Sequence, residues 1–417
     1  MSRRSRLWAL VALLIVMLLS FSFVVAQDAA GPEPLGERPD APPYGLHGPY
    51  WVGTQDRVID PDSAEPLEVT IWYPALNPEG LTEEIAYPAT LKFEVPDGIV
   101  GIVYGHALRD AVLDMTGGPY PLVVFSPGFG AARSNYAHLT EHLASYGFVV
   151  IAPDHHEIFD PTWADIPKST ISRPQDVLKV IAFADELTAA GGSMEGLINM
   201  DLIAVSGHSY GGYTALAAAG ARFDIQGFNA RCDAARAASD PNAWLCDTLE
   251  PFEDEMLSLT GLASMPDGLW PAWADPRVDA IIPLAGDSYI FDQAGLAEIT
   301  IPVMAMGGTL DTSTPYEWGA DPTYEYISSD TKALVTFVNA EHMIFGSTCT
   351  DIPWAVEMGA SFFCSDPVWD MQRTQDITHH LATAFLLDVL NGDAEAHAAL
   401  APDAVSFAGV IYQAEGY

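Results

Sequence analysis

Hydrophobic positions alternate with other residues before residue 75 and form unbroken runs after residue 120. Leu67, Val69, Ile71 and Tyr73 recur with a period of two, which predicts a half-buried strand. Short continuous apolar runs follow at residues 121–126, 147–153, 202–205, 278–284, 301–306 and 333–338. Strands that are apolar on both sides are typical of a parallel sheet covered on both faces.

Stretches with helical spacing separate these apolar runs. They span residues 134–148, 174–190 and 370–390, and a helix rich in small residues follows residue 209. Strands and helices in alternation predict an α/β protein with a mostly parallel, doubly wound sheet and helices on both faces. Residues 77–120 are mixed and turn-rich, and their pattern assigns them to no element.

One connection in this pattern is too long for an ordinary loop. Residues 222–276 lie between the helix after residue 209 and the next apolar run, and they carry Trp244, Trp270 and Trp273. Ligands of open α/β sheets bind outside the carboxyl ends of the strands. We therefore expect a cap or lid insertion over that crevice, with an excursion packed elsewhere on the surface as the alternative.

The ends of the chain differ in composition from its centre. Residues 1–26 have a basic start, an apolar run and a small residue at position 26, the pattern of an export signal. The apolar run is also long enough to serve as an uncleaved membrane anchor. Residues 27–48 are rich in Pro and Gly and are expected to be a linker. This leaves a catalytic domain over 49–391 and a C-terminal tail over 392–417.

The chain is strongly acidic. Its 417 residues include 56 Asp and Glu against 17 Lys and Arg, for a formal net charge of -39. Such a surface repels nucleic acid and anionic lipid headgroups, so we expect neither as a partner, nor an integral membrane role unless the leader is uncleaved. A surface adapted to high salt is a second interpretation of the acidic composition.

An exported chain with four cysteines is expected to form disulfides. Local pairing joins Cys232 to Cys246 and Cys349 to Cys364, although four cysteines allow three connectivities. Free buried thiols are the alternative.

A Gly-x-Ser-x-Gly motif lies between an apolar strand and the small-residue helix. The motif is Gly207-His208-Ser209-Tyr210-Gly211. A sharp strand-to-helix turn crowds the backbone, so glycine on both sides of the serine removes side chains that would clash. The position of the motif predicts that Ser209 is an exposed nucleophile rather than part of a structural turn.

A serine nucleophile needs a base and an acid that orients the base. Asp311 follows the apolar run at 301–306 in a Gly-rich turn, and His342 follows the run at 333–338. The order serine, acid, histidine at successive strand ends is that of α/β-hydrolase triads. Asp287 also follows an apolar strand and is the alternative acid.

The tetrahedral intermediate of acyl transfer also needs donors for its oxyanion. We expect one from the backbone N–H of Tyr210, the residue after the nucleophile, and one from Phe129 in the turn Pro127-Gly128-Phe129-Gly130. His155, His156 and Glu157 are too close in sequence to face one metal ion together. The predicted chemistry needs no metal and no organic cofactor.

Several segments together carry a family resemblance. "PLVVFSPGFGAARSNYAHLTEHLASYGFVVIAPDHHE", "GHSYGGYTAL" and "GGTLDTSTP", with "EHMIFG", resemble bacterial α/β-hydrolases grouped with platelet-activating-factor acetylhydrolases and predicted dienelactone hydrolases. The first and third also resemble polyester hydrolases and cutinases. The resemblance implies the α/β-hydrolase fold, Ser209 as nucleophile, His342 as base and oxyanion donors at Phe129 and Tyr210. A serine at position 209 argues against dienelactone hydrolase activity, which uses cysteine.

These observations predict a secreted or cell-envelope serine carboxylic ester hydrolase. Its partners would be small-molecule or lipid esters, of short-acyl or phospholipid type. The alternatives are a lipase or cutinase-like polyester hydrolase, a serine peptidase, and an envelope binding protein that kept the fold without catalysis.

Overall fold

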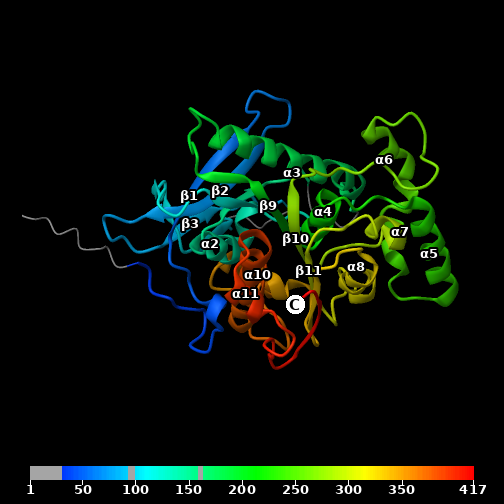
Figure 1. Cartoon of the computed structure of the whole chain (residues 1–417). Coiled ribbons are helices and arrows are strands. Elements are labelled where there is room, and N and C mark those ends of the chain that lie inside the picture. The colour runs from blue at the N-terminus through cyan, green and yellow to red at the C-terminus, as the bar shows by residue number, and fades with distance from the viewer. Residues whose placement is uncertain (1–30, 93–98, 158–162) are drawn as a thin grey trace, which may run out of the picture.

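The computed structural model describes residues 31–92, 99–157 and 163–417 (Figure 1). The predicted export signal, residues 1–26, lies outside the described residues. The strands are β1 (Trp51–Ile59), β2 (Leu67–Leu76), β3 (Ile85–Pro88), β4 (Ile102–Gly105), β5 (Leu108–Arg109), β6 (Val112–Leu113), β7 (Tyr120–Ser126), β8 (Val149–Pro153), β9 (Ile198–His208), β10 (Val278–Leu284), β11 (Val303–Gly308), β12 (Lys332–Phe337) and β13 (Val410–Glu415).

One large twisted sheet organises the molecule. Its strand order is β13-β12-β11-β10-β9-β7-β8-β2-β1-β5, with β6 paired to β2. Strands β8, β7, β9, β10, β11 and β12 run parallel to their neighbours in the centre, whereas β2, β1 and β13 add antiparallel pairs toward the edges. The predicted mostly parallel, doubly wound sheet is confirmed.

Helices cover both faces of this sheet, as predicted. They are α2 (Ala137–Ser145), α3 (Ile166–Thr188), α4 (Tyr210–Ala218), α5 (Ile225–Ala238), α6 (Glu253–Thr260), α7 (Asp292–Leu296), α8 (Ala320–Tyr326), α9 (Pro353–Glu357), α10 (Met371–Asn391) and α11 (Ala394–Ala399).

Alternate residues of the central strands enter two separate cores. In β7, Leu122 and Val124 pack toward α3 and α4, while Val123 and Phe125 pack toward α2 and α10. Because each central strand is buried on both sides, it is apolar throughout, and this is the origin of the unbroken runs in the sequence.

Helix α3 begins at Ile166, eight residues before the start that Pro174 suggested. A proline inside a helix removes the N–H that would bond to the carbonyl four residues earlier, here that of Thr170. The hydroxyl of Tyr213 donates to this carbonyl at 2.6 Å. A partner from α4 therefore satisfies the acceptor, which a sequence pattern does not reveal.

The segments expected to be a linker and a C-terminal tail both contact the rest of the domain. The C-terminal tail, residues 392–417, forms α11 and β13, and β13 pairs antiparallel with β12. In the linker, the backbone N–H groups of Glu37 and Arg38 donate to Asp376 of α10 at 2.8 and 3.0 Å. No residue of β13 is fully buried, because the strand lies at the sheet edge. Its hydrophobic pattern is therefore weak in the sequence.

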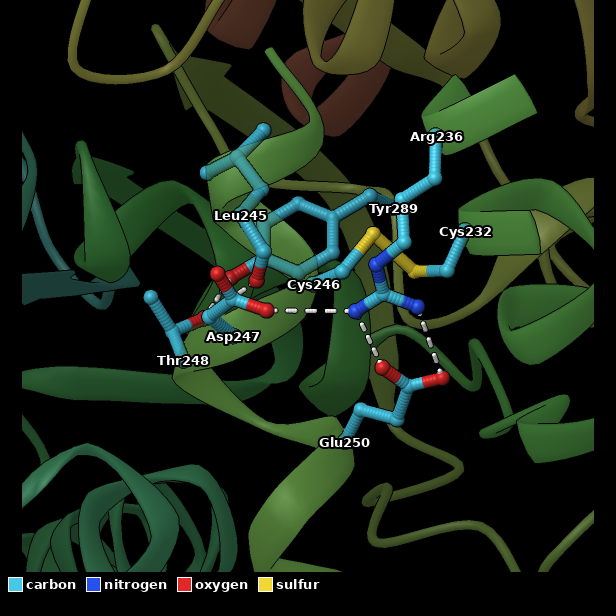
Figure 2. Close-up of a disulfide and its surroundings, with 8 residues drawn as sticks. All are labelled: Cys232, Arg236, Leu245, Cys246, Asp247, Thr248, Glu250 and Tyr289. Atoms are coloured by element: carbon cyan, nitrogen blue, oxygen red, sulfur yellow. Dashed lines mark hydrogen bonds and ion pairs between the residues drawn. A yellow bond between two sulfur atoms is a disulfide. The ribbon is translucent and has the colours of Figure 1, made fainter. Parts of the chain in front are cut away.

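The long insertion, residues 222–276, contains α5 and α6 with a turn of 3-10 helix at Ala243–Thr248 between them. The disulfide Cys232–Cys246 joins this turn to α5, and Arg236 pairs with Asp247 and Glu250 beside it (Figure 2). A second disulfide joins Cys349 to Cys364. Both predicted pairings are confirmed.

No helix in the described part of the chain combines the length and the apolar run that crossing a bilayer requires.

Candidate active site

Ser209 lies at the sharp turn between β9 and α4. Its backbone has φ 60° and ψ -124°, a conformation that is strained for a residue with a side chain. A Cβ at Gly211 would lie 1.8 Å from the carbonyl oxygen of Ser126, and one at Gly207 would lie 2.4 Å from that of Gly211. Both positions therefore require glycine, and the turn presents the Ser209 side chain at the carboxyl end of the sheet.

The structure brings Ser209, His342 and Asp311 together. His342 Nε2 lies 2.8 Å from Ser209 Oγ, and His342 Nδ1 lies 2.7 Å from Asp311 Oδ2. The other oxygen of Asp311 accepts backbone N–H groups from Ser313 and Thr314, both at 2.8 Å. The turn after β11 thus fixes the carboxylate, and the carboxylate fixes the imidazole.

The charges of the pair favour a histidine that accepts a proton. Burial alone lowers the pKa of His342, but the Asp311 carboxylate and its hydrogen bond outweigh burial and raise this pKa above its ordinary value. Burial alone raises the pKa of Asp311, yet the His342 charge and the hydrogen bonds from His342 and Thr314 hold it below its usual range. Asp311 is therefore the ionised partner.

Asp287, the alternative acid, lies in the wall of the same cavity at the end of β10. The Nδ1 atom of His342 faces Asp311 rather than Asp287. Burial, reinforced by the nearby charge of Asp311, raises the pKa of Asp287 to about 8. The raised pKa disfavours the charged form of Asp287, whereas the lowered pKa of Asp311 favours its charged form.

His208, the residue before Ser209 in the turn, contacts the backbone of His342. Its Nδ1 lies 2.8 Å from the hydroxyl of Tyr136, and its Nε2 lies 3.0 Å from the carbonyl oxygen of His342. Burial, followed by the His342 charge, lowers the pKa of His208 to about 3, so the ring is neutral. A neutral ring that donates from Nε2 accepts a hydrogen bond from the Tyr136 hydroxyl at Nδ1.

An apolar cavity of about 400 Å³ opens over Ser209. Phe129 and Tyr210, the predicted oxyanion donors, both line it, with ring centroids 5.9 Å apart. Residues 222–276, the predicted cap, contribute Trp244, Leu245 and Thr248 to the cavity wall. Other residues in this wall are Trp163, Tyr289, Met343, Ile352, Trp354 and Phe362.

In the described residues, no group of three or more His, Cys, Asp and Glu side chains is arranged to hold a metal ion. The side chain of His155, which the sequence places beside His156 and Glu157, contacts the side chains of Asp176 and Ser126, each at 2.9 Å.

Two family models match the chain. The chlorophyllase model matches residues 111–231, and the model of platelet-activating factor acetylhydrolase, isoform II, matches residues 44–160. Cutinase est1 of Thermobifida alba is 28% identical over 54% of this chain and 53% of its own length. Platelet-activating factor acetylhydrolase of Cavia porcellus is 32% identical over 27% of this chain and 28% of its own. The matches thus span about half the length of the cutinase and 28% of the acetylhydrolase.

A solved structure extends the likeness to nearly the whole chain. The ferulic acid esterase from Streptomyces cinnamoneus superposes with a TM-score of 0.52 at 22% identity, over 87% of this chain and 96% of the esterase. At that identity the likeness shows the fold alone. The sequence matches confirm the resemblance to acetylhydrolases and cutinases.

Proposed function

We propose an ester hydrolase activity for this chain, which belongs to the α/β-hydrolases and is similar to several of their serine esterases. The observation that carries the proposal is the hydrogen-bonded line from Ser209 through His342 to Asp311 at the base of an apolar cavity. Esters fit this arrangement because their carbonyl carbon accepts a serine nucleophile and their leaving alcohol needs one proton.

The reaction proceeds through an acyl-enzyme. Ser209 Oγ attacks the ester carbonyl while His342 Nε2 takes its proton, and the C–O bond to the alcohol breaks as His342 returns that proton. Water then attacks the acyl-enzyme by the same route and releases the acid. Asp311 stabilises the imidazolium in both halves, and the backbone N–H groups of Phe129 and Tyr210 bind the oxyanion.

The cavity wall favours esters with a compact apolar part, of the short-acyl or phospholipid type. Aromatic side chains supply large contact areas in this wall, and polar side chains such as Asp287, Thr314 and Glu341 also line it. Two disulfides further favour an extracytoplasmic protein, since disulfides persist in oxidising compartments.

A cutinase-like action on polyester surfaces is the second candidate. Trp244 and Phe362, both in the cavity wall, are 40% and 60% exposed. Exposed aromatic rings at the cavity entrance would contact an insoluble apolar chain. Release of soluble acid from polyester film, set against hydrolysis of dissolved short esters, separates the two.

The test is hydrolysis of p-nitrophenyl butyrate by the purified protein and by Ser209→Ala. Ser258→Ala, on the exposed surface of α6, is the matched control. We expect the wild type and the control to turn over the ester and Ser209→Ala to lose at least about 10³-fold in kcat. Full activity in Ser209→Ala would overturn the mechanism.

A further inference from the structure

A buried arginine in α3 contacts the turn that leads to Phe129. The Arg173 side chain is fully buried, and its Nη1 donates to the carbonyl of Pro127 at 2.7 Å. Its Nη2 donates to the carbonyl of Gly128 at 2.9 Å. This turn lies against the nucleophile, because a Cβ added at Gly128 would be 3.5 Å from Ser209 Cβ.

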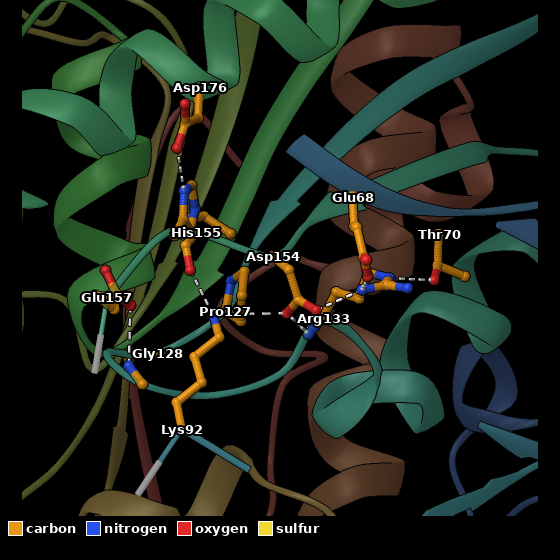
Figure 3. Close-up of polar contacts among 12 residues, drawn as sticks. Glu68, Thr70, Lys92, Pro127, Gly128, Arg133, Asp154, His155, Glu157 and Asp176 are labelled. Carbon is orange, nitrogen blue, oxygen red and sulfur yellow. Dashed lines mark hydrogen bonds and ion pairs between the residues drawn. The ribbon is translucent and has the colours of Figure 1, made fainter. Parts of the chain in front are cut away.

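Glu157 holds the guanidinium in place from the opposite side. Arg173 Nε donates to Glu157 Oε2 at 2.9 Å, and Arg173 Nη2 also pairs with Oε1. Oε1 in turn accepts the backbone N–H of Gly130 at 2.9 Å. Burial is the largest single influence and raises the pKa of Glu157, but the charge and hydrogen bond of Arg173, with the charges of His155 and Lys92, together hold this pKa at about 2. Figure 3 shows Glu157 beside the turn at Pro127 and Gly128.

Because the peptide bond is planar and trans, the contact of Arg173 with the Gly128 carbonyl also sets the direction of the Phe129 N–H. The carbonyl of Gly128 and the N–H of Phe129 belong to one planar peptide unit, in which the two bonds point in opposite directions. A donor that binds the Gly128 carbonyl from the α3 side therefore aims the Phe129 N–H away from α3. Without that donor the peptide unit can rotate, because no side chain at position 128 restricts it.

We infer that Arg173 is a positioning residue that fixes the Phe129 amide as an oxyanion donor by binding the two carbonyls before it. The inference rests on the proposed ester hydrolase function. Arginine suits this role because its rigid planar fork reaches two carbonyls and a carboxylate at once, whereas lysine presents a single point charge.

The same guanidinium also contacts the side chain of the second donor. Its central carbon lies 5.4 Å from the centroid of the Tyr210 ring, whose hydroxyl bonds to Thr170 one turn earlier in α3. The turn that carries the Phe129 N–H and the side chain of Tyr210 thus both contact one turn of α3.

The test is Arg173→Lys with Arg133→Lys as the matched control. Arg133 is also buried and paired with a carboxylate, that of Asp154, and it bonds to Thr70 (Figure 3). Its side chain makes none of the carbonyl contacts that Arg173 makes. Both variants keep the positive charge of a buried ion pair, and only Arg173→Lys alters the contacts with the turn.

Removal of one oxyanion donor costs about 10²–10³-fold in kcat. For p-nitrophenyl butyrate we expect Arg173→Lys to lower kcat by about 10²-fold with KM changed by less than about threefold, and Arg133→Lys to keep kcat within about threefold. A trifluoromethyl ketone forms a tetrahedral adduct on Ser209, so its inhibition constant should rise in proportion to the fall in kcat/KM.

Equal losses in kcat for the two lysine variants, or an unchanged inhibition constant in Arg173→Lys, would overturn the inference while leaving the ester hydrolase intact. A wild type that hydrolyses no ester would overturn the function and the inference together. If Arg173→Lys does not fold, Glu157→Gln loosens the same guanidinium and should lower kcat by about tenfold. Wild-type kcat in folded Glu157→Gln would contradict the role.

Discussion

Replacement of Asp287 by asparagine tests which of the two acids near His342 carries the charge. The neutral carboxyl and the amide have nearly the same shape, so the substitution leaves packing intact. Burial and the Asp311 charge raise the pKa of Asp287 to about 8, against about 3.9 in an unfolded chain. Between these values the folded state binds one more proton than the unfolded state, so the free energy of unfolding falls as pH rises.

The size of the effect follows from the same two values. Between the unfolded and the folded pKa, each pH unit lowers the free energy of unfolding of the wild type by about 1.4 kcal/mol. Asparagine does not titrate, so Asp287→Asn should be more stable than the wild type by up to about 1.5 kcal/mol at pH 5 and about 4 kcal/mol at pH 7, with no further gain well above pH 8.

Urea unfolding at pH 5, 6, 7 and 8 measures this difference, and Asp311→Asn is the contrast. The pKa of Asp311 is lowered on folding, so its carboxylate stabilises the native state above the unfolded pKa. Asp311→Asn should therefore be less stable than the wild type at pH 7 and lose about 10⁴-fold in kcat, whereas Asp287→Asn should lose at most about tenfold. A pH-independent stability difference for Asp287→Asn, or the larger loss of kcat in that variant, would refute the reasoning.

Three further outcomes follow from the described contacts. Tyr213→Phe leaves the carbonyl opposite Pro174 without its donor, so urea unfolding should show a loss of about 1–3 kcal/mol, with part of it recovered in the double variant with Pro174→Ala. The acid limb of kcat/KM should have its midpoint above pH 6.5, because the pKa of His342 is raised; a midpoint near pH 5 would contradict this. Replacement of Cys349 and Cys364 by serine opens a loop with a sequence separation of 15 and should cost about 3 kcal/mol in thermal unfolding, whereas an unchanged Tm would show that the loop needs no closure.

The central sheet and the placement of three side chains could be predicted because both follow from local pattern. Each central strand is buried on both faces, so its apolar run is visible without knowledge of its neighbours. Ser209, Asp311 and His342 each follow such a run, and parallel strands end at the same edge of the sheet. The sequence alone left Asp287 open, because it also follows a strand. The direction of His342 Nδ1 and the opposite pKa shifts of the two carboxyls separate them in the structure.

The features that escaped prediction depend on distant partners. The strand β13 is half-exposed at an edge and pairs with β12 far away in the sequence, so its own pattern is weak. Arginine and glutamate are residue types that usually face solvent. Arg173 and Glu157 are buried because each pairs with the opposite charge of the other. An arginine directly before a proline, on an apolar helix face, is the one local signal that could have marked this site.

The most direct test of the central claim is covalent labelling of the purified chain with a fluorophosphonate, followed by intact mass and peptide mapping. Such reagents react with a serine that a neighbouring base activates. We expect one adduct on the peptide that contains Ser209, and a rate of labelling reduced by several orders of magnitude in His342→Ala. A folded wild type that stays unlabelled, or that carries the adduct on another residue, would contradict the proposed esterase site.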